Sequence, residues 1–295
     1  MQYVGFDIHK KYTFFTQMDA TGQIRRQGKL TNDRDALAAF FAEIDESASV
    51  VIEASMNWYH LYDLLESLEI PVTLAHPLRT RAIAEAKVKT DKVDSAILAH
   101  LLRTDLAQAA YIPPREIRDL RELLRYRAAL VKIQTMIKNR VHALLLKHGY
   151  QSPYTDTFGA HGRAWLATLA LRPAYRQALR GFLTLLDALR PQIEEASRTV
   201  DQYAMTTPSA DELCTLPGVG HYTALLILAE IGDIARFPDP KHLVSYAGLA
   251  PKVHASGGHI YTGHISKQGS RWLRWILIGA AIDAGHQPGR YQRCA

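Results

Sequence analysis

The chain has 295 residues, of which 47% are hydrophobic and 22% charged, enough for one large or two ordinary folded domains. Its formal net charge of +6 and isoelectric point of about 9.2 favour nucleic acid over other partners. No run of 18 residues lacks a charge and the two cysteines lie far apart, which excludes a membrane span and a disulfide framework. The N-terminus runs straight into a strand-like pattern without a signal peptide, which predicts a cytoplasmic protein.

Alternating or β-branched apolar residues predict five strands in the first third of the chain, at residues 2–7, 12–18, 23–30, 49–53 and 72–74. Helical spacing predicts four helices there, one capped by Thr31-Asn32-Asp33 and the others at residues 58–68, 78–87 and 92–106. A three-stranded meander followed by alternating helices and strands is typical of an α/β ribonuclease-H-like fold. Pro113-Pro114 then predicts that this domain covers residues 1–112.

Four acidic residues of this domain are candidates for one metal site. Asp7 and Glu53 end apolar strands, and Asp91 and Asp94 stand three apart at the start of a predicted helix. If they converge, their mutual repulsion calls for divalent cations such as Mg²⁺, which suit phosphodiester chemistry. The alternative is ordinary surface roles, with Asp91 and Asp94 capping the helix or pairing with nearby lysines.

Residues 113–205 are predicted to form a helical arm and connector. Leu123, Leu130, Ile137 and Leu144 repeat every seven residues, which favours a coiled-coil-like seam and self-association. Between residues 115 and 147 there are nine basic and three acidic residues. We expect this charge to face nucleic acid, although a merely solvated face is the alternative. The predicted contacts are Arg118, Arg121, Arg125, Lys132, Lys138 and Arg140. Helices at residues 163–205 are expected to break at Pro173 and Pro191.

Residues 206–295 are expected to form a mostly α-helical domain. Gly218-Val219-Gly220 between helical stretches is typical of a helix-hairpin-helix element, whose backbone N–H groups can approach a phosphate, with a plain packing corner as the alternative. Further along, Ser256 precedes two glycines in a predicted polar loop. Lys267, Arg271 and Arg274 are basic residues expected to hold a phosphate near it.

Two blocks of sequence resemble one family. Residues 5–10, 52–55 and 89–96 resemble the RuvC-like domain of DEDD insertion-sequence transposases, a group that includes the Piv-type DNA invertases. Residues 216–220, 237–251 and 265–274 look like the second, transposase domain of the same family. The resemblance spans about residues 2–149 and 211–285, and both blocks occur in the expected order.

The resemblance implies a recombinase that cuts and rejoins double-stranded donor and target DNA. It implies that Asp7, Glu53, Asp91 and Asp94 bind Mg²⁺ and that Ser256 is the nucleophile, with Ser266 as the second choice. It also implies a structured noncoding guide RNA, a homo-oligomer (dimer or tetramer) and a place at the bacterial nucleoid.

Two other classes of protein share some of these features. A metal-dependent endonuclease of the Holliday-junction-resolving type would use the same acids with water as the nucleophile. An actin-like kinase would share the Gly5-Phe6-Asp7-Ile8 strand start, but the chain lacks a second phosphate loop of the expected kind. A noncatalytic nucleic-acid-binding protein is a third possibility, against which the presence of all four acids argues.

Overall fold

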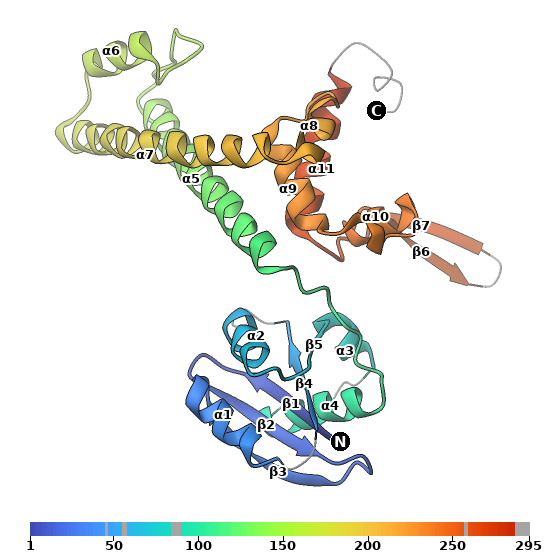
Figure 1. Ribbon diagram of the computed structural model, residues 1–295. Helices are drawn as coiled ribbons and strands as arrows, with labels where there is room; N and C mark the ends of the chain where they lie inside the picture. The colour runs from blue at the N-terminus through green and yellow to red at the C-terminus, as the bar shows by residue number, and fades with distance from the viewer. Residues whose placement is uncertain (45–46, 55–57, 84–89, 257–258, 287–295) are drawn as a thin grey trace. The chain divides into compact units, whose positions relative to one another are not determined.

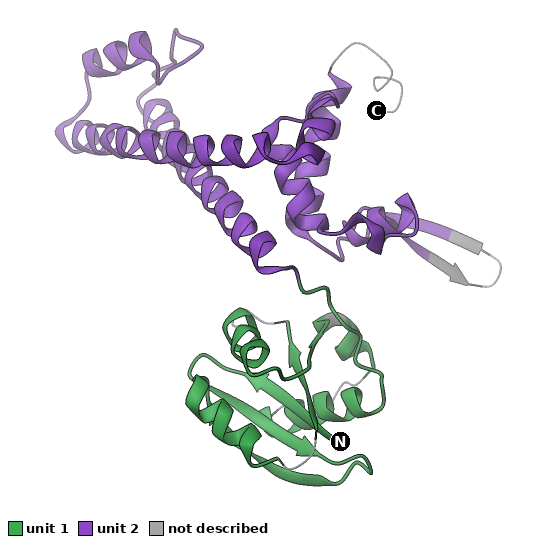
Figure 2. Ribbon diagram, viewed as in Figure 1, with its two compact units in different colours: residues 1–112 green, residues 113–295 purple. Residues whose placement is uncertain are grey.

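The computed structural model describes residues 1–44, 47–54, 58–83, 90–256 and 259–286, without the side chains of Leu78, residues 254–256 and residues 259–260. The chain divides into two units, residues 1–112 and residues 113–295, and each is described by itself (Figure 2).

Unit 1 is built on a five-stranded sheet with strand order β3-β2-β1-β4-β5 (Figure 1). The strands are β1 (Gln2–Ile8), β2 (Tyr12–Met18), β3 (Ile24–Thr31), β4 (Ala48–Glu53) and β5 (Val72–Ala75). The first three form an antiparallel meander, whereas β4 and β5 run parallel to β1. The helices are α1 (Arg34–Ala42), α2 (Trp58–Ser67), α3 (Pro77–Ile83) and α4 (Asp91–Arg103). The predicted order of elements is confirmed; the predicted end of the third helix, residues 84–87, lies outside the described residues.

Helices cover both faces of this sheet. Val50 and Ile52 of β4 pack in the core that α1 and α2 help to form, while Val51 between them packs with Leu98 of α4. A strand segment buried on both faces needs consecutive apolar residues, which is why Val50, Val51 and Ile52 follow one another at the buried centre of β4. The chain enters α1 through Asp33, whose carboxylate accepts a hydrogen bond of 2.9 Å from the Ala36 N–H, as the capping sequence predicted.

One glycine sets how closely α4 approaches the sheet. A Cβ at Gly5 of β1 would lie 2.1 Å from the Ser95 carbonyl oxygen and 2.5 Å from the Ala99 nitrogen, both in the backbone of α4. Strand and helix therefore touch backbone to backbone, which only glycine permits. Beside this contact, the buried hydroxyls of Thr16 and Ser95 are hydrogen-bonded at 2.8 Å.

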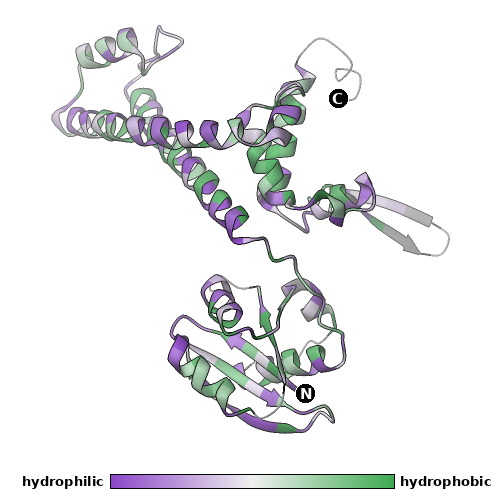
Figure 3. Cartoon of the chain, in the orientation of Figure 1, coloured by the Kyte–Doolittle hydropathy of each residue, from purple (hydrophilic) through white to green (hydrophobic). Residues whose placement is uncertain are grey.

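Unit 2 is mostly helical, with one hairpin. Its elements are α5 (Arg115–Leu146), α6 (Ala160–Thr168), α7 (Pro173–Met205), α8 (Pro208–Cys214), α9 (His221–Ile231), the 3₁₀ turn η1 (Ile234–Arg236), α10 (Pro240–Tyr246), β6 (Pro251–Ser256), β7 (His259–Ile265) and α11 (Arg271–Gly285). The hydrophobic helix α9 packs against α5, α7, α8 and α11 at the centre of the main core (Figure 3). Helices α5 and α7 present alternating hydrophobic and hydrophilic residues along their length (Figure 3).

The heptad seam of α5 is used inside the chain. Leu130, Ile137 and Leu144 are buried, and α5 packs against α7; Leu144 shares a cluster with Leu179 of that helix. The apolar seam of α5 therefore packs against α7 of the same chain and needs no second copy of the protein. The predicted self-association stays a prediction that these positions do not support.

Two expectations for unit 2 were wrong. Helix α7 starts at Pro173 but continues through Pro191, because its long buried side outweighs the one hydrogen bond that a proline removes. The predicted polar loop around Ser256 is instead the antiparallel hairpin of β6 and β7, with Ser256 paired to His259. The signal was present in the sequence, since Gly257-Gly258 between two polar, β-branched segments is a common hairpin connection.

Gly5→Ala should displace α4 and cost unit 1 about 2 kcal/mol or more, because the new methyl group overlaps backbone atoms that cannot rotate away. Hydrogen–deuterium exchange of the full chain should show faster exchange in β1 and α4. Gly28→Ala is the matched control, since its Cβ would meet only the Phe15 ring, at 3.2 Å. Equal exchange in both variants would contradict the proposed close contact.

Candidate functional site

The carboxyl ends of β1 and β4 bring two predicted acids to the same edge of the sheet. The strands are parallel, with Phe6 opposite Ile52, and the next residues along each strand are Asp7 and Glu53. The crevice beyond the carboxyl ends of parallel strands is a common place for a functional site in α/β domains.

Helix α4 supplies the other two acids from its first turn. Thr90 caps the helix by accepting a hydrogen bond from the Val93 N–H, and Asp91 and Asp94 follow on one side of it. The partial positive charge of a helix N-terminus favours carboxylates there. Because Gly5 allows α4 to lie directly on β1, Asp91 and Asp94 come close to Asp7, which is two residues further along the strand.

Asp7, His9 and Asp91 form the tightest cluster. One possible ligand atom from each lies within 4.8 Å of those of the other two. His9 Nε2 is 3.3 Å from Asp7 Oδ2 and 3.2 Å from Asp91 Oδ2. The Tyr12 hydroxyl donates to the same Asp91 oxygen at 3.1 Å. Sequence reasoning did not select His9 or Tyr12, although His9 is two residues after Asp7, the spacing that places side chains on one side of a strand.

Glu53 and Asp94 lie outside this tightest group, although both are described and partly buried. Asp94 is still close enough to Asp7 to act on its ionisation. His60, a second histidine of this domain, lies with Nε2 3.1 Å from the Asn32 carbonyl oxygen, so its ring is engaged elsewhere.

The surroundings of Asp7 disfavour its charge. Burial, the largest effect, raises the pKa of its carboxyl, and the negative charges of Asp91 and Asp94 raise it further, while His9 partly opposes them. A bound cation would reverse this balance. The donor set of carboxylate oxygens with one imidazole fits a divalent metal ion, which Asp7 and Asp91 would hold.

The second candidate region is the base of the β6–β7 hairpin. A Cβ at Gly269 would lie 2.0 Å from the Tyr246 carbonyl oxygen, so the segment after β7 presses on the segment before β6. Backbone hydrogen bonds join Ser266 N–H to the Ala250 oxygen at 2.8 Å and Lys267 N–H to the Gly248 oxygen at 3.0 Å. Lys267 is exposed and has a φ of 56°, a strained conformation for a residue with a side chain. These contacts therefore fix the distance between the start of β6 and the end of β7.

The buried carboxylate of Glu230 in α9 connects the base of the β6–β7 hairpin to helix α5. Its side chain is 4% exposed and accepts hydrogen bonds from Arg125 at 2.7 Å and from the Ser270 hydroxyl at 2.8 Å. Ser270 is in turn the N-cap of α11, accepting from the Leu273 N–H. Arg121 donates to the carbonyl oxygens of Ala229 and Glu230, which the end of α9 leaves free.

This network changes the interpretation of several basic residues. Arg118 and Arg121 are buried, and the guanidinium group of Arg125 is paired with Glu230, so all three have contacts inside unit 2. Arg274 donates to the Ala247 oxygen at 3.1 Å and is likewise occupied. Their role as nucleic-acid contacts stays a prediction, which these internal contacts do not support. A charge spacing read from sequence cannot reveal such partners, which for Arg125 lie 105 residues away. Lys267 and Arg271 are exposed and remain available.

Of the two glycines in the predicted hairpin motif, Gly218 has a packing role. It has a φ of 78°, and its Cβ would lie 2.8 Å from the Ala280 oxygen of α11. Gly220 is the N-cap of α9 and has open space where a Cβ would lie. The packing-corner alternative thus accounts for Gly218, and a phosphate contact at Gly220 stays a prediction.

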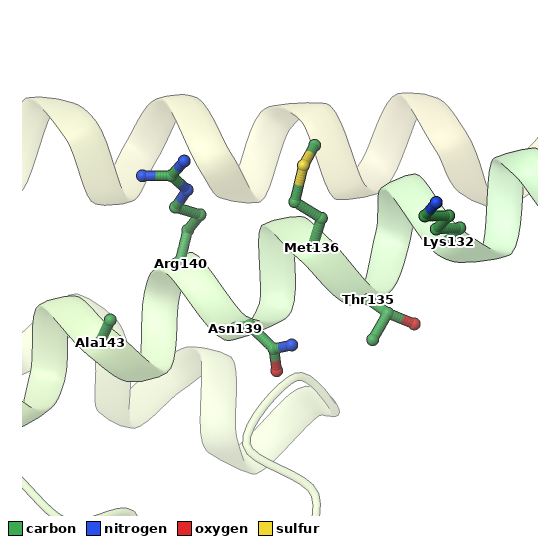
Figure 4. A pocket seen from close by; sticks show the side chains of 6 residues that line it. All are labelled: Lys132, Thr135, Met136, Asn139, Arg140 and Ala143. Carbon is green, nitrogen blue, oxygen red and sulfur yellow. The ribbon is translucent and has the colours of Figure 1, made fainter.

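An open hollow of about 640 Å³ runs along the exposed side of α5 (Figure 4). Lys132, Met136 and Arg140 stand four apart and form one stripe of its lining. Lys138 lies nearby with its Nζ 5.4 Å from the centre of the Phe158 ring. Lys132 and Arg140 are exposed, so of the predicted arm contacts they are the ones whose positions suit a phosphate backbone.

Two family profiles match the chain, one over each candidate region. Residues 4–149 match the DEDD transposase family profile of the IS110 group, and residues 210–292 match the profile described as Transposase IS116/IS110/IS902 family. The chain belongs to this transposase family. The first matched range includes all four acids of this chain, and the second includes Glu230 and the hairpin. The predicted resemblance to DEDD insertion-sequence transposases is confirmed.

Several curated proteins are similar to this transposase over most of its length. The transposase for insertion sequence element IS1111A of Coxiella burnetii is 28% identical over 79% of this chain and 64% of its own length. The transposase for insertion sequence element IS1328 of Yersinia enterocolitica is 26% identical over 79% of this chain and 69% of its own length. Within the described residues of the transposase, no helix is both long and apolar enough to cross a membrane.

Asp7→Asn should raise the melting temperature of the metal-free transposase at pH 7, because it removes a partly buried negative charge from a carboxyl group whose pKa is raised. The gain should shrink as the pH falls, since the wild-type carboxyl then binds a proton. The same variant should lose the stabilisation that Mg²⁺ or Mn²⁺ gives the wild type. Asp35→Asn, an exposed acid of α1, is the control in these melting curves. Full metal stabilisation of Asp7→Asn would show that this residue holds no ion.

Glu230→Ala should destabilise unit 2 by about 3–5 kcal/mol, because it leaves the buried Arg121 and the partly buried Arg125 without their carboxylate. Hydrogen–deuterium exchange in α9 and α11 should be faster in this variant than in wild type. Glu194→Ala, on the exposed side of α7, serves as the control and should change little. A Glu230→Ala protein as stable as that control would mean that the network contributes nothing.

Proposed function

We propose that this transposase is a recombinase that cuts and rejoins double-stranded DNA by serine chemistry at a metal-assisted site. Asp7, Glu53, Asp91 and Asp94 hold divalent cations, Mg²⁺ among them, and Ser256 is the nucleophile. The observation that carries the proposal is the convergence of Asp7 and Asp91 on one histidine nitrogen, in a chain of the DEDD transposase family. The strand order of unit 1, with helices on both sheet faces, supports a RuvC-like fold.

The acids would hold the metal, and Mg²⁺ when bound would stabilise charge on the scissile phosphate and ease loss of the serine proton. Without a cation, the crowded carboxylates repel both one another and a phosphate. Burial of Asp7 and the position of Asp91 at a helix N-terminus keep the two oxygens in place for an ion.

Ser256 ends β6, and its backbone is paired with His259 across the hairpin. In the proposed step its Oγ attacks phosphorus and loses its proton, and a phosphoserine bond forms. The bond from phosphorus to the neighbouring nucleotide breaks, and the departing oxygen takes up a proton to become a free hydroxyl. A hydroxyl of another strand then attacks the phosphoserine and releases Ser256. Each step exchanges one phosphoester for another, so no external energy is needed.

Basic groups of unit 2 would hold the DNA backbone during this exchange. Lys267 and Arg271 are exposed at the base of the hairpin, where the close contact of Gly269 with Tyr246 fixes the chain. Lys132 and Arg140 add positive charge along α5. These positions suit contacts to backbone rather than to bases.

Contacts to the DNA backbone do not read its base sequence. We therefore assign sequence recognition to a structured noncoding guide RNA that pairs with donor and target DNA. The resemblance to the family suggests this RNA, and the exposed basic stripe of α5 supports a shape-reading surface. A homo-oligomer is part of the same proposal, because strand exchange needs several phosphates to be cut together.

Ser256→Ala should lower DNA cleavage by at least about a thousandfold, because it removes the nucleophile rather than a supporting group. The assay uses labelled DNA carrying the element's ends and flanks, transcripts of those ends, and Mg²⁺. Denaturing gels should show a covalent protein–DNA adduct with wild type. Ser266→Ala, whose hydroxyl lies in the segment after β7, is the control and should still form the adduct. Cleavage without an adduct by Ser256→Ala would instead indicate an endonuclease that uses water.

A further inference from the structure

We propose that His9 is a direct nitrogen ligand of the cation held by Asp7 and Asp91, and that its imidazole makes the site prefer Mn²⁺ to Mg²⁺. This ligand role rests on the proposed function, which requires the metal but involves only carboxylates. His9 would thus be a determinant of which ion the transposase uses.

The spacing of the three groups is that of metal ligands. His9 Nε2 lies 3.2 Å from Asp91 Oδ2 and 3.3 Å from Asp7 Oδ2. Neighbouring ligands on an octahedral ion with bonds of about 2.1 Å stand about 3 Å apart. The three atoms therefore need to move little to share one ion.

The polar neighbours of this nitrogen are the two carboxylates with which it would share the ion. Nε2 is shielded from solvent and has no hydrogen-bond partner of suitable geometry there, although two carboxylate oxygens are near. A shielded polar atom without a hydrogen bond costs free energy, and an ion between the three groups would remove that cost. His60 offers the opposite case, because its Nε2 already contacts the Asn32 carbonyl oxygen.

Tyr12 holds the arrangement in place. Its ring centre is 4.7 Å from that of His9, and its hydroxyl donates to Asp91 Oδ2 at 3.1 Å. Lys29 Nζ lies 4.4 Å from the centre of the same tyrosine ring. Groups that orient a ligand in this way commonly accompany metal sites and set the direction in which each ligand points.

An imidazole changes which ion is favoured. Mg²⁺ prefers oxygen ligands and keeps several waters, whereas Mn²⁺ accepts nitrogen and stands above Mg²⁺ in affinity for mixed donors. Two carboxylates with one imidazole should therefore bind Mn²⁺ more tightly than Mg²⁺, and the margin should depend on His9.

The test compares full-length wild type, His9→Gln and His60→Gln by calorimetric titration with Mn²⁺ and with Mg²⁺. Loss of His9 should weaken Mn²⁺ binding about tenfold or more and Mg²⁺ binding much less. Pulsed electron paramagnetic resonance of bound Mn²⁺ should show ¹⁴N coupling in wild type and in His60→Gln, and none in His9→Gln. Circular dichroism confirms that each variant is folded, and His9→Asn provides a second replacement.

The Asp7→Asn variant distinguishes failure of the His9 ligand role from failure of the proposed metal site. Unchanged Mn²⁺ affinity and ¹⁴N coupling in His9→Gln would overturn the ligand role of His9. If Asp7→Asn then still abolished ion binding, the metal site of the proposed function would stand. If Asp7→Asn also bound Mn²⁺ normally, both the ligand role and that metal site would fail.

Discussion

Direct contact between the backbones of β1 and α4 is the constraint on which the candidate catalytic centre depends. Gly5 has no Cβ, and any larger residue would overlap the Ser95 oxygen of the helix. The contact fixes the height of α4 above the sheet. It thereby determines how far Asp91 and Asp94 lie from Asp7, two residues beyond the glycine. A site made from a strand end and a helix N-terminus is only as well defined as the packing between those two elements.

The same packing creates an electrostatic conflict. Partial burial of Asp7 and the nearby charges of Asp91 and Asp94 raise the pKa of its carboxyl and oppose the folded state when no cation is bound. In the proposed function, this loss of stability is offset when a divalent ion binds the carboxylates. The buried carboxylate of Glu230 in unit 2 differs from Asp7 because it has partners within the chain. It forms an ion pair with Arg125 and accepts a hydrogen bond from Ser270, and these contacts stabilise the base of the hairpin.

Much of unit 1 could be predicted from sequence because its signals are local. Strand ends, a capping sequence and an i, i+3 pair of aspartates place Asp7, Glu53, Asp91 and Asp94 at one edge of the sheet without knowledge of distant contacts. His9 and Tyr12 escaped prediction because their contacts cross the β1–β2 turn and reach a helix about eighty residues later. Charge spacing in α5 does not reveal which arginines have partners inside the fold. Arg121 and Arg125 are indistinguishable in sequence from surface arginines, and only the fold shows Glu230 beside them.

Anomalous diffraction from crystals of the transposase soaked in Mn²⁺ tests the central claim most directly. An ion bonded to the carboxylates of Asp7 and Asp91, below the N-terminus of α4, is the predicted result. Manganese bound elsewhere in unit 1 at saturating concentration, with those two carboxylates free of metal, would contradict it.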